Sequence, residues 1–135
     1  EHMPKDKIRY LMGVGTPGNI LESVRRGVDL FDCVMPSRNA RHGHLNTWNG
    51  IINIMNVKYR DDSEPIDTHC DCPVCKRYSR AYIRHLWRCG ESTASTLLSI
   101  HNIKFLVDFS QKCRQAILED RFGDFYNEHY KNLTK

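Results

Sequence analysis

A crowded group of cysteines is the feature that most constrains how this sequence can fold. The segment Cys70-Asp71-Cys72-Pro73-Val74-Cys75 holds three of the six cysteines in the chain. A structural zinc site needs four ligands in a tetrahedron, and Cys-x-Cys-x2-Cys spacing supplies three of them from one turn. We therefore expect one structural zinc ion per chain, bound by Cys70, Cys72 and Cys75. A catalytic zinc is disfavoured, because three thiolates give the site a net negative charge and make the ion a weak Lewis acid.

The fourth ligand is not fixed by spacing. His69 is adjacent to Cys70 and poorly placed to reach the same ion. His85 and Cys89 belong to one expected helix, and His101 begins the next, so these three remain open. The alternative to a metal site is a set of free core cysteines, or one disulfide and a spare thiol. It is less favoured, because three core thiols rarely crowd into six residues.

Composition bounds the chain to one ordinary globular domain. It has 135 residues, of which 40% are hydrophobic and 27% charged, with a net charge of +4. This mildly basic balance is compatible with an anionic partner and argues against a disordered tail. No apolar run approaches the roughly 20 residues that span a bilayer, so we expect no membrane partner. Cysteines at metal-ligand spacing rather than in disulfide pairs predict a reducing, cytoplasmic location. Residues 1–3 are either native or left from cloning.

The first third of the chain has the pattern of a βαβ unit. Residues 8–14 and 28–34 are short, nearly apolar runs that predict two strands. Between them, Thr16 offers a helix N-cap, Pro17 suits the first helical position, and Gly27 stops the helix. Such a unit implies a parallel sheet with strands buried on both faces. Two parallel strands cannot form a self-sufficient sheet, so we expect further strands outside this chain, in a larger domain or an oligomer.

The rest of the chain changes character. Two extended runs around Asn49-Gly50 predict a hairpin, and the acidic segment 60–69 predicts a loop. Helical spacing predicts a helix from Lys76 to Gly90 and a longer one over residues 95–119. The final stretch predicts a loosely docked tail.

Asp32 lies near the end of the second strand, before a loop rich in Arg and Asn. In parallel barrels, reactive side chains come from the C-terminal ends of strands. Such an acid can be a nucleophile, a general base, or a salt-bridge partner of Arg38 or Arg41, and the residues alone favour the salt bridge. The sequence does not rank Asp32 above Asp29. The loop 37–44 suits phosphate contacts, but a solvated surface loop has the same composition.

Three stretches together resemble one protein family. "RYLMGVGTP", "VDLFDCVMPSRNARHG" and "CDCPVC…SRAYIRHL…HN" are similar to the C-terminal portion of queuine tRNA-ribosyltransferases of bacterial type, also called tRNA-guanine transglycosylases. The resemblance runs from Arg9 to Tyr126. It implies an α/β fold, the last two or so βα units of a (β/α)8 TIM barrel with an inserted zinc-binding subdomain. Residues 1–45 would hold the barrel units, 46–101 the zinc subdomain, and 102–135 the closing barrel helix and tail.

The resemblance also implies roles for individual residues. These enzymes exchange guanine at the tRNA wobble position for a 7-deazaguanine, preQ1 or queuine, in queuosine biosynthesis. Asp32 matches the nucleophile that forms a covalent ribosyl-aspartate, and Met12 and Gly13 match the base pocket. The family's zinc motif places its histidine at His101, which would be the fourth ligand. The general acid/base lies outside this chain, so we expect the isolated chain to be inactive.

Partners follow from the same resemblance. Two segments match stretches that contact the tRNA anticodon loop: Gly13, Val14, Gly15, Thr16, Pro17, Gly18 and Asn19, and then Ser37, Arg38, Asn39, Ala40 and Arg41. The segment 77–86 matches a homodimer contact. The alternative function is a stand-alone zinc-stabilised RNA-binding or dimerisation module without catalysis. An archaeosine-type transglycosylase is less favoured, because no RNA-binding domain follows the zinc subdomain.

Overall fold

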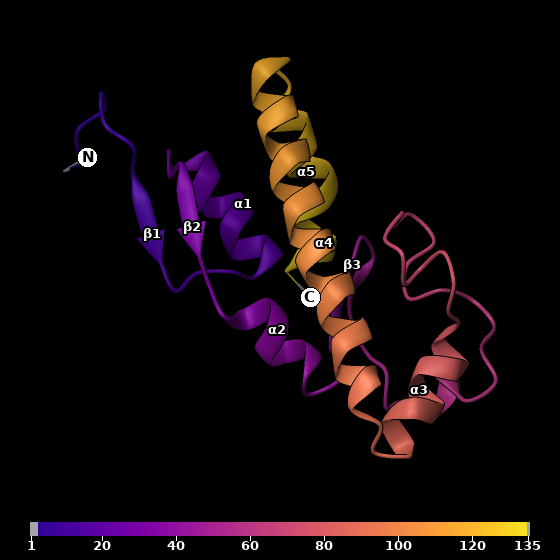
Figure 1. The fold of residues 1–135 in the computed structure, drawn as a ribbon. Helices are drawn as coiled ribbons and strands as arrows, with labels where there is room; N and C mark the ends of the chain where they lie inside the picture. The colour runs from indigo at the N-terminus through magenta and orange to yellow at the C-terminus, as the bar shows by residue number, and fades with distance from the viewer. Residues whose placement is uncertain (1–2, 135) are drawn as a thin grey trace.

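Residues 3–134 of the computed structural model are described, and they form several helices and two separate two-stranded sheets (Figure 1). In chain order, the elements are β1 (Tyr10–Met12), α1 (Pro17–Arg25), β2 (Leu30–Asp32), α2 (Met35–Ala40), β3 (His44–Thr47), β4 (Gly50–Asn53), the 3-10 turn η1 (Val57–Tyr59), α3 (Arg80–Arg88), α4 (Ser92–Leu118) and α5 (Phe122–Leu133). Figure 1 shows β1 and β2 at one side, α3 at the other, and the long helix α4 between them. The fold is thus of mixed α/β class. None of the described helices is long and apolar enough to cross a bilayer.

The predicted βαβ unit is confirmed. β1 and β2 pair in parallel, with Met12 opposite Asp32. Thr16 caps α1, because its Oγ1 accepts a hydrogen bond from the Asn19 N–H at 3.3 Å, and proline follows at the first helical position. The chain turns after α1 at Gly27, whose φ of 90° favours glycine. Each strand keeps only three residues, fewer than the apolar runs predicted.

The expectation that these strands are buried on both faces is wrong for this chain. Tyr10, Met12 and Leu30 share one face and are 48%, 74% and 51% exposed. Leu11 and Phe31 point to the opposite face and are half-buried, and Phe31 packs against the helices. One face of the sheet is therefore covered, and the other is bare.

The hairpin is confirmed at the predicted place. β3 and β4 are antiparallel, and Thr47 pairs with Gly50. The two central turn residues are Trp48 and Asn49, and neither has a positive φ. The positive φ, 110°, falls on Gly50 as it begins β4. Asn-Gly thus marks the reversal correctly, although the glycine lies just after the turn.

The helices differ from the prediction at three places. The helix expected from Lys76 begins at Arg80, because Ser79 caps it by accepting from the Tyr82 N–H at 3.2 Å. The segment expected as a loop before residue 44 contains α2. The predicted tail is wrong: α5 is a docked helix, with Phe125 and Leu133 buried against α1 and α4.

Two hydrophobic clusters share α4. The first lies around its N-terminal half and comprises Ala40, Leu45, Ile54, Ile66, Cys72, Val74, Ile83, Leu97 and Leu98. The second lies around its C-terminal half and comprises Ile20, Leu21, Phe105, Phe109, Cys113, Ala116, Phe125 and Leu133. His101 and Asn102, both fully buried, lie between them on α4. The helix is therefore the common element that joins the cysteine-rich half to the βαβ half.

Candidate metal centre and the exposed aspartate

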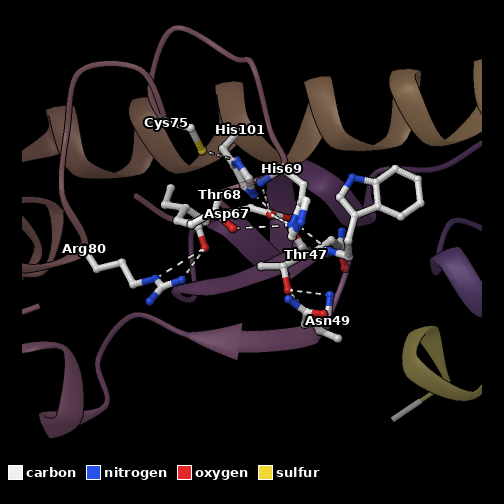
Figure 2. A network of polar contacts seen from close by, with 12 residues as sticks. Thr47, Asn49, Asp67, Thr68, His69, Cys75, Arg80 and His101 are labelled. Carbon is white, nitrogen blue, oxygen red and sulfur yellow. Dashed lines mark hydrogen bonds and ion pairs between the residues drawn. The ribbon is translucent and has the colours of Figure 1, made fainter. Parts of the chain in front are cut away.

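Cys70, Cys72, Cys75 and His101 come together in one group. The cysteines lie on the loop before α3, and the histidine lies well inside α4 rather than at its start. Their ligand atoms are all within 4.8 Å of one another. His101 Nδ1 is 3.4 Å from Cys75 Sγ and 3.7 Å from Cys72 Sγ, and Figure 2 shows the Cys75 and His101 side chains pointing toward each other. In a tetrahedral site with bonds of about 2.3 Å to sulfur and 2.0 Å to nitrogen, such atoms lie about 3.5 Å apart. The group can therefore hold a metal ion.

The orientation of His101 suits a metal ligand. Its Nε2 lies 2.9 Å from the carbonyl oxygen of Asn46, which can only accept a hydrogen bond, so the proton is assigned to Nε2. This leaves the Nδ1 lone pair directed at the sulfur atoms. A backbone carbonyl that holds the second ring nitrogen is the usual support of a metal-binding histidine. The imidazole is fully buried, so the site is closed to solvent on this side.

The other two candidates for the fourth ligand lie elsewhere. His85 and Cys89 face each other on α3, with Nε2 and Sγ 3.7 Å apart, and both are exposed. Spacing alone could not separate them from His101, because the choice depends on where α3 and α4 pack.

The Cys72 and Cys75 thiols have pKa values that are shifted in opposite directions. Hydrogen bonds with Cys70 and Cys75 hold the pKa of the Cys72 thiol well below its ordinary value. Hydrogen bonds with Cys70 and Cys72, followed by burial, raise the pKa of the Cys75 thiol. Three thiolates this close repel one another, so all three ionise together only when a cation balances them. The donor set is that of a closed structural site rather than a catalytic one.

An ion pair beside the cluster was missed by the sequence analysis. Lys104 lies three residues after His101 on α4, and its Nζ is 2.8 Å from a carboxylate oxygen of Asp71. Asp71 is the residue between the ligands Cys70 and Cys72. Lys104 also contacts Asp108 one turn further along α4. The cysteine loop is thus fastened to α4 at a second point.

A buried carboxylate supports the other end of the same loop, and its network is drawn in Figure 2. Asp67, 3% exposed, accepts hydrogen bonds from the backbone N–H groups of Trp48 and His69, each at 2.8 Å. Arg80 donates to the carbonyl of Ile66 at 3.2 Å. These contacts join the hairpin turn, the loop and the start of α3. They had no sequence signal, because the partners are far apart in the chain.

Asp32 ends β2 with an exposed side chain. The Gly13 N–H donates to its carbonyl oxygen at 2.9 Å and lies 3.4 Å from Oδ1. Met12 is its partner across the two strands, so the structure brings these three predicted site residues together. Within residues 3–134 Asp32 forms no ion pair, so the expected salt bridge to Arg38 or Arg41 is not found.

The neighbouring acid behaves differently. Asp29 accepts from the Arg9 backbone N–H at 2.9 Å and lies 3.2 Å from the Arg9 Nε. The backbone hydrogen bond, and then the guanidinium, lower the pKa of the Asp29 carboxyl. Asp29 is therefore engaged in holding the chain before β1 to the chain before β2, whereas Asp32 forms no ion pair within residues 3–134.

Tyr10 is a neighbour of Asp32 that the sequence analysis did not single out. A hydrogen bond to the Asp32 carboxylate raises the pKa of the Tyr10 hydroxyl, with smaller contributions from desolvation and from the negative charge. Tyr10 lies two residues before Met12, so both side chains point to the bare face of the sheet. This spacing of two residues along the strand is the feature of the sequence that could have identified Tyr10.

The two segments expected to contact RNA are placed as follows. In residues 13–19, Gly13 and Asn19 are exposed, whereas Gly15, Pro17 and Gly18 are buried. A Cβ on Gly15 would lie 2.5 Å from the Cβ of Cys33, so this glycine is required by close packing. Residues 37–41 belong to α2 and its C-cap; Arg38 and Arg41 are exposed there, and Ala40 is buried.

Comparison with known proteins decides the family. The model of the queuine tRNA-ribosyltransferase family matches residues 1–135. The chain belongs to this family. It is 53% identical over 133 residues to the queuine tRNA-ribosyltransferase of Haemophilus influenzae and 52% identical over 133 residues to that of Actinobacillus succinogenes. In each case the match covers 98% of this chain and 35% of the relative.

The chain thus spans about a third of the length of these queuine tRNA-ribosyltransferases. The cysteine–histidine group and the exposed aspartate both lie inside the matched region. The family match over the whole chain favours an enzyme portion over a stand-alone binding module.

Proposed function

We propose that this chain is the C-terminal part of a tRNA-guanine transglycosylase. The enzyme exchanges guanine at the wobble position of tRNA for a 7-deazaguanine, preQ1 or queuine. One observation carries the proposal: in a member of this family, Asp32 ends a parallel strand with an exposed side chain that forms no ion pair within residues 3–134, with Met12 and Gly13 beside it. A carboxylate so placed is available to a substrate rather than used in the fold.

In the proposed reaction, an Asp32 carboxylate oxygen attacks C1′ of the ribose. The glycosidic bond to guanine breaks, and a covalent ribosyl-aspartate forms. The ring nitrogen of the incoming base then attacks C1′ and releases the Asp32 carboxylate, while the proton on that nitrogen passes to a base outside these 135 residues. The leaving guanine needs a proton, and the acid that supplies it belongs to the part of the enzyme outside these 135 residues. The chain alone is therefore inactive.

The proposed fold of the whole enzyme is a (β/α)8 TIM barrel, and β1 and β2 are two of its strands. The bare face formed by Tyr10, Met12 and Leu30 supports this, because parallel strands are covered on both faces in such folds. Residues 1–45 would belong to the barrel and residues 46–101 to the zinc subdomain. Residues 102–135 would close the barrel, with α4 continuous across the second boundary.

Zinc is the proposed resident ion, held by Cys70, Cys72, Cys75 and His101. Three thiolates and an imidazole are a common structural set for zinc, and the distances from His101 Nδ1 to the sulfur atoms of Cys72 and Cys75 are compatible with its bond lengths. When bound, zinc supplies charge balance and cross-linking rather than reaction chemistry. The residues themselves join the cysteine loop to α4, and so brace the subdomain against the second hydrophobic cluster. Cysteines that bind a metal ion rather than form disulfides suit a reducing, cytoplasmic compartment.

Two surfaces are assigned to partners. Arg38 and Arg41 would contact the phosphates of the tRNA anticodon loop, for which the guanidinium geometry is suited. A second copy of the enzyme would dock on α3 and the segment before it. There Tyr78 and Tyr82 stack with ring centroids 5.4 Å apart, and Tyr82 is 46% exposed. Exposed aromatic pairs are enriched in such interfaces.

Incorporation of labelled guanine into tRNA tests the proposal. The full-length enzyme should incorporate the label, and Asp32→Ala should abolish this. Asp29→Ala is the matched control, because it removes a carboxylate just before the opposite, N-terminal end of β2 and should leave most activity. Incorporation by the full-length Asp32→Ala variant would contradict the assigned role.

A further inference from the structure

Asn102 is a fully buried amide with three hydrogen-bond partners on two other elements. Its Nδ2 donates to the carbonyl oxygen of Pro36 in α2 and to that of His44 in β3, each at 3.0 Å. Its Oδ1 accepts from the N–H of Asn46 in β3, also at 3.0 Å. The side chain thus connects α4 to both α2 and β3 from a site with no exposed surface.

These partners fix one orientation of the amide. Two of them are carbonyl oxygens, which need a donor, and the third is an N–H, which needs an acceptor. A reversed amide would place its oxygen against the carbonyls of Pro36 and His44. Because an unsatisfied buried polar group is costly, Asn102 sets the relative positions of the three backbone groups closely.

Asn102 is also joined to the metal centre. The preceding residue, His101, donates to the carbonyl oxygen of Asn46, while Asn102 accepts from the N–H of the same Asn46. One residue of β3 is therefore held by two consecutive residues of α4. The first of these is a candidate metal ligand, and the second reaches α2.

α2 depends on outside contacts for its position. It has six residues, and its N-cap, Val34, makes no side-chain hydrogen bond. A helix this short is not stable by itself. Its anchors are the buried Ala40, which belongs to the first hydrophobic cluster, and the Pro36 carbonyl held by Asn102. Arg38 and Arg41 extend from this helix, and within residues 3–134 neither forms an ion pair.

We propose that Asn102 is a positioning residue that holds α2, and with it Arg38 and Arg41, in a fixed place relative to the metal centre. It thereby sets how tightly the enzyme binds tRNA, not how fast Asp32 reacts. Asp32 is held separately, through the pairing of β2 with β1 and the Gly13 N–H. The kinetic part of this inference rests on the proposed function.

Hydrogen exchange on this chain with zinc bound tests the structural part. Asn102→Asp keeps the size and one acceptor but places a carboxylate oxygen against two carbonyls. The amides of Arg38 and Arg41, which donate to Val34 and Ser37 in the wild-type chain, should exchange about tenfold faster. The Gly13 amide in the β1–β2 pair should be unchanged, and zinc should remain near one per chain. Ser99→Ala, which removes a hydrogen bond within α4 alone, is the matched control and should change neither amide group.

Kinetics of the full-length enzyme test the functional part. Asn102→Asp should raise KM for tRNA about five- to tenfold and leave kcat within about twofold. In an Arg38→Ala/Arg41→Ala background the same change should add little, because Asn102 acts through these arginines. Asn102→Ser keeps one hydroxyl and should give an intermediate KM, which provides a milder variant if Asn102→Asp folds poorly.

Three results would overturn the inference. The first is that Asn102→Asp leaves hydrogen exchange at the Arg38 and Arg41 amides unchanged. The second is that Asn102→Asp and Asn102→Ser both lose zinc and raise exchange uniformly along the chain. The third is that Asn102→Asp lowers kcat of the full-length enzyme and leaves KM for tRNA unchanged. The hydrogen-exchange experiment involves no tRNA, so its outcome does not depend on whether Asp32 is the nucleophile.

Discussion

The metal end and the strand pair of this chain differ in how complete they are. At the metal end, all four candidate ligands are present, and His101 is fully buried with both ring nitrogens engaged. At the strand pair, two strands of three residues leave Met12 74% and Leu30 51% exposed on one face. The two regions differ in how far apart in the sequence their contributing residues lie. The four ligands lie within one segment, whereas a parallel sheet is assembled from strands that are far apart in a chain. A segment can thus carry a whole set of candidate metal ligands but only two strands of a parallel sheet.

Removing a metal ligand should have the largest effect. Cys72→Ser or His101→Ala should abolish stoichiometric zinc binding and unfold the cysteine-rich half, because the binding free energy, on the order of 10 kcal/mol, is folding free energy. Zinc content and far-UV circular dichroism measure the two outcomes. Cys89→Ser is the control, since this exposed thiol lies outside the cluster and its loss should leave one zinc per chain. Stoichiometric zinc in the ligand variants would show that the assigned set is wrong.

The effect of a substitution on the bare face of β1 and β2 should differ between this chain and the full-length enzyme. Leu30→Ser in this chain should alter the free energy of unfolding by less than about 0.5 kcal/mol, because the side chain is already half exposed. In the full-length enzyme the same change should cost about 2 kcal/mol or more, because the proposed barrel would bury this face. Urea unfolding of both proteins measures the difference. Equal costs in the two contexts would mean that nothing covers this face in the enzyme.

The Asp29–Arg9 pair should give the smallest effect, and that effect should depend on pH. The folded protein lowers the pKa of Asp29, so its contribution to stability is present above the unfolded pKa of about 3.9 and lost as pH falls through the folded value. Asp29→Asn should therefore lower the melting temperature slightly at neutral pH and not at about pH 2. If the difference in melting temperature between the wild type and Asp29→Asn grew as the pH fell, the pH dependence would have the opposite sign, and the Asp29–Arg9 pair would not stabilise the fold in this way.

Local patterns in the sequence predicted part of this structure. Thr16-Pro17, the apolar runs and Asn49-Gly50 are short-range signals, and each marked its element correctly. The cysteine spacing likewise predicted a metal site. His101 could not be chosen from the spacing, because its position opposite the cysteines depends on the packing of α4. The resemblance to the family supplied that residue.

Local sequence patterns could not predict the contacts between segments that are distant in the chain. Lys104 pairs with Asp71, and Asn102 reaches Pro36, across long separations that carry no periodic signal. α5 was taken for a tail, although Phe122, Phe125 and Leu133 recur at helical spacing, and charged residues between them obscured the pattern. The face of β1 and β2 that carries Tyr10, Met12 and Leu30 is largely apolar in the sequence yet exposed in the structure, and the proposed barrel accounts for this difference.

Detection of a covalent tRNA adduct on a denaturing gel tests the central claim most directly. The trapping base is 9-deazaguanine, which lacks the nitrogen needed to displace the aspartate. This chain and the full-length enzyme are compared, each with its Asp32→Ala variant. The account predicts an adduct with the full-length enzyme only, lost on Asp32→Ala. An adduct with this chain alone would show that two strands suffice to build the reactive site, and one that survives Asp32→Ala would exclude this aspartate as the nucleophile.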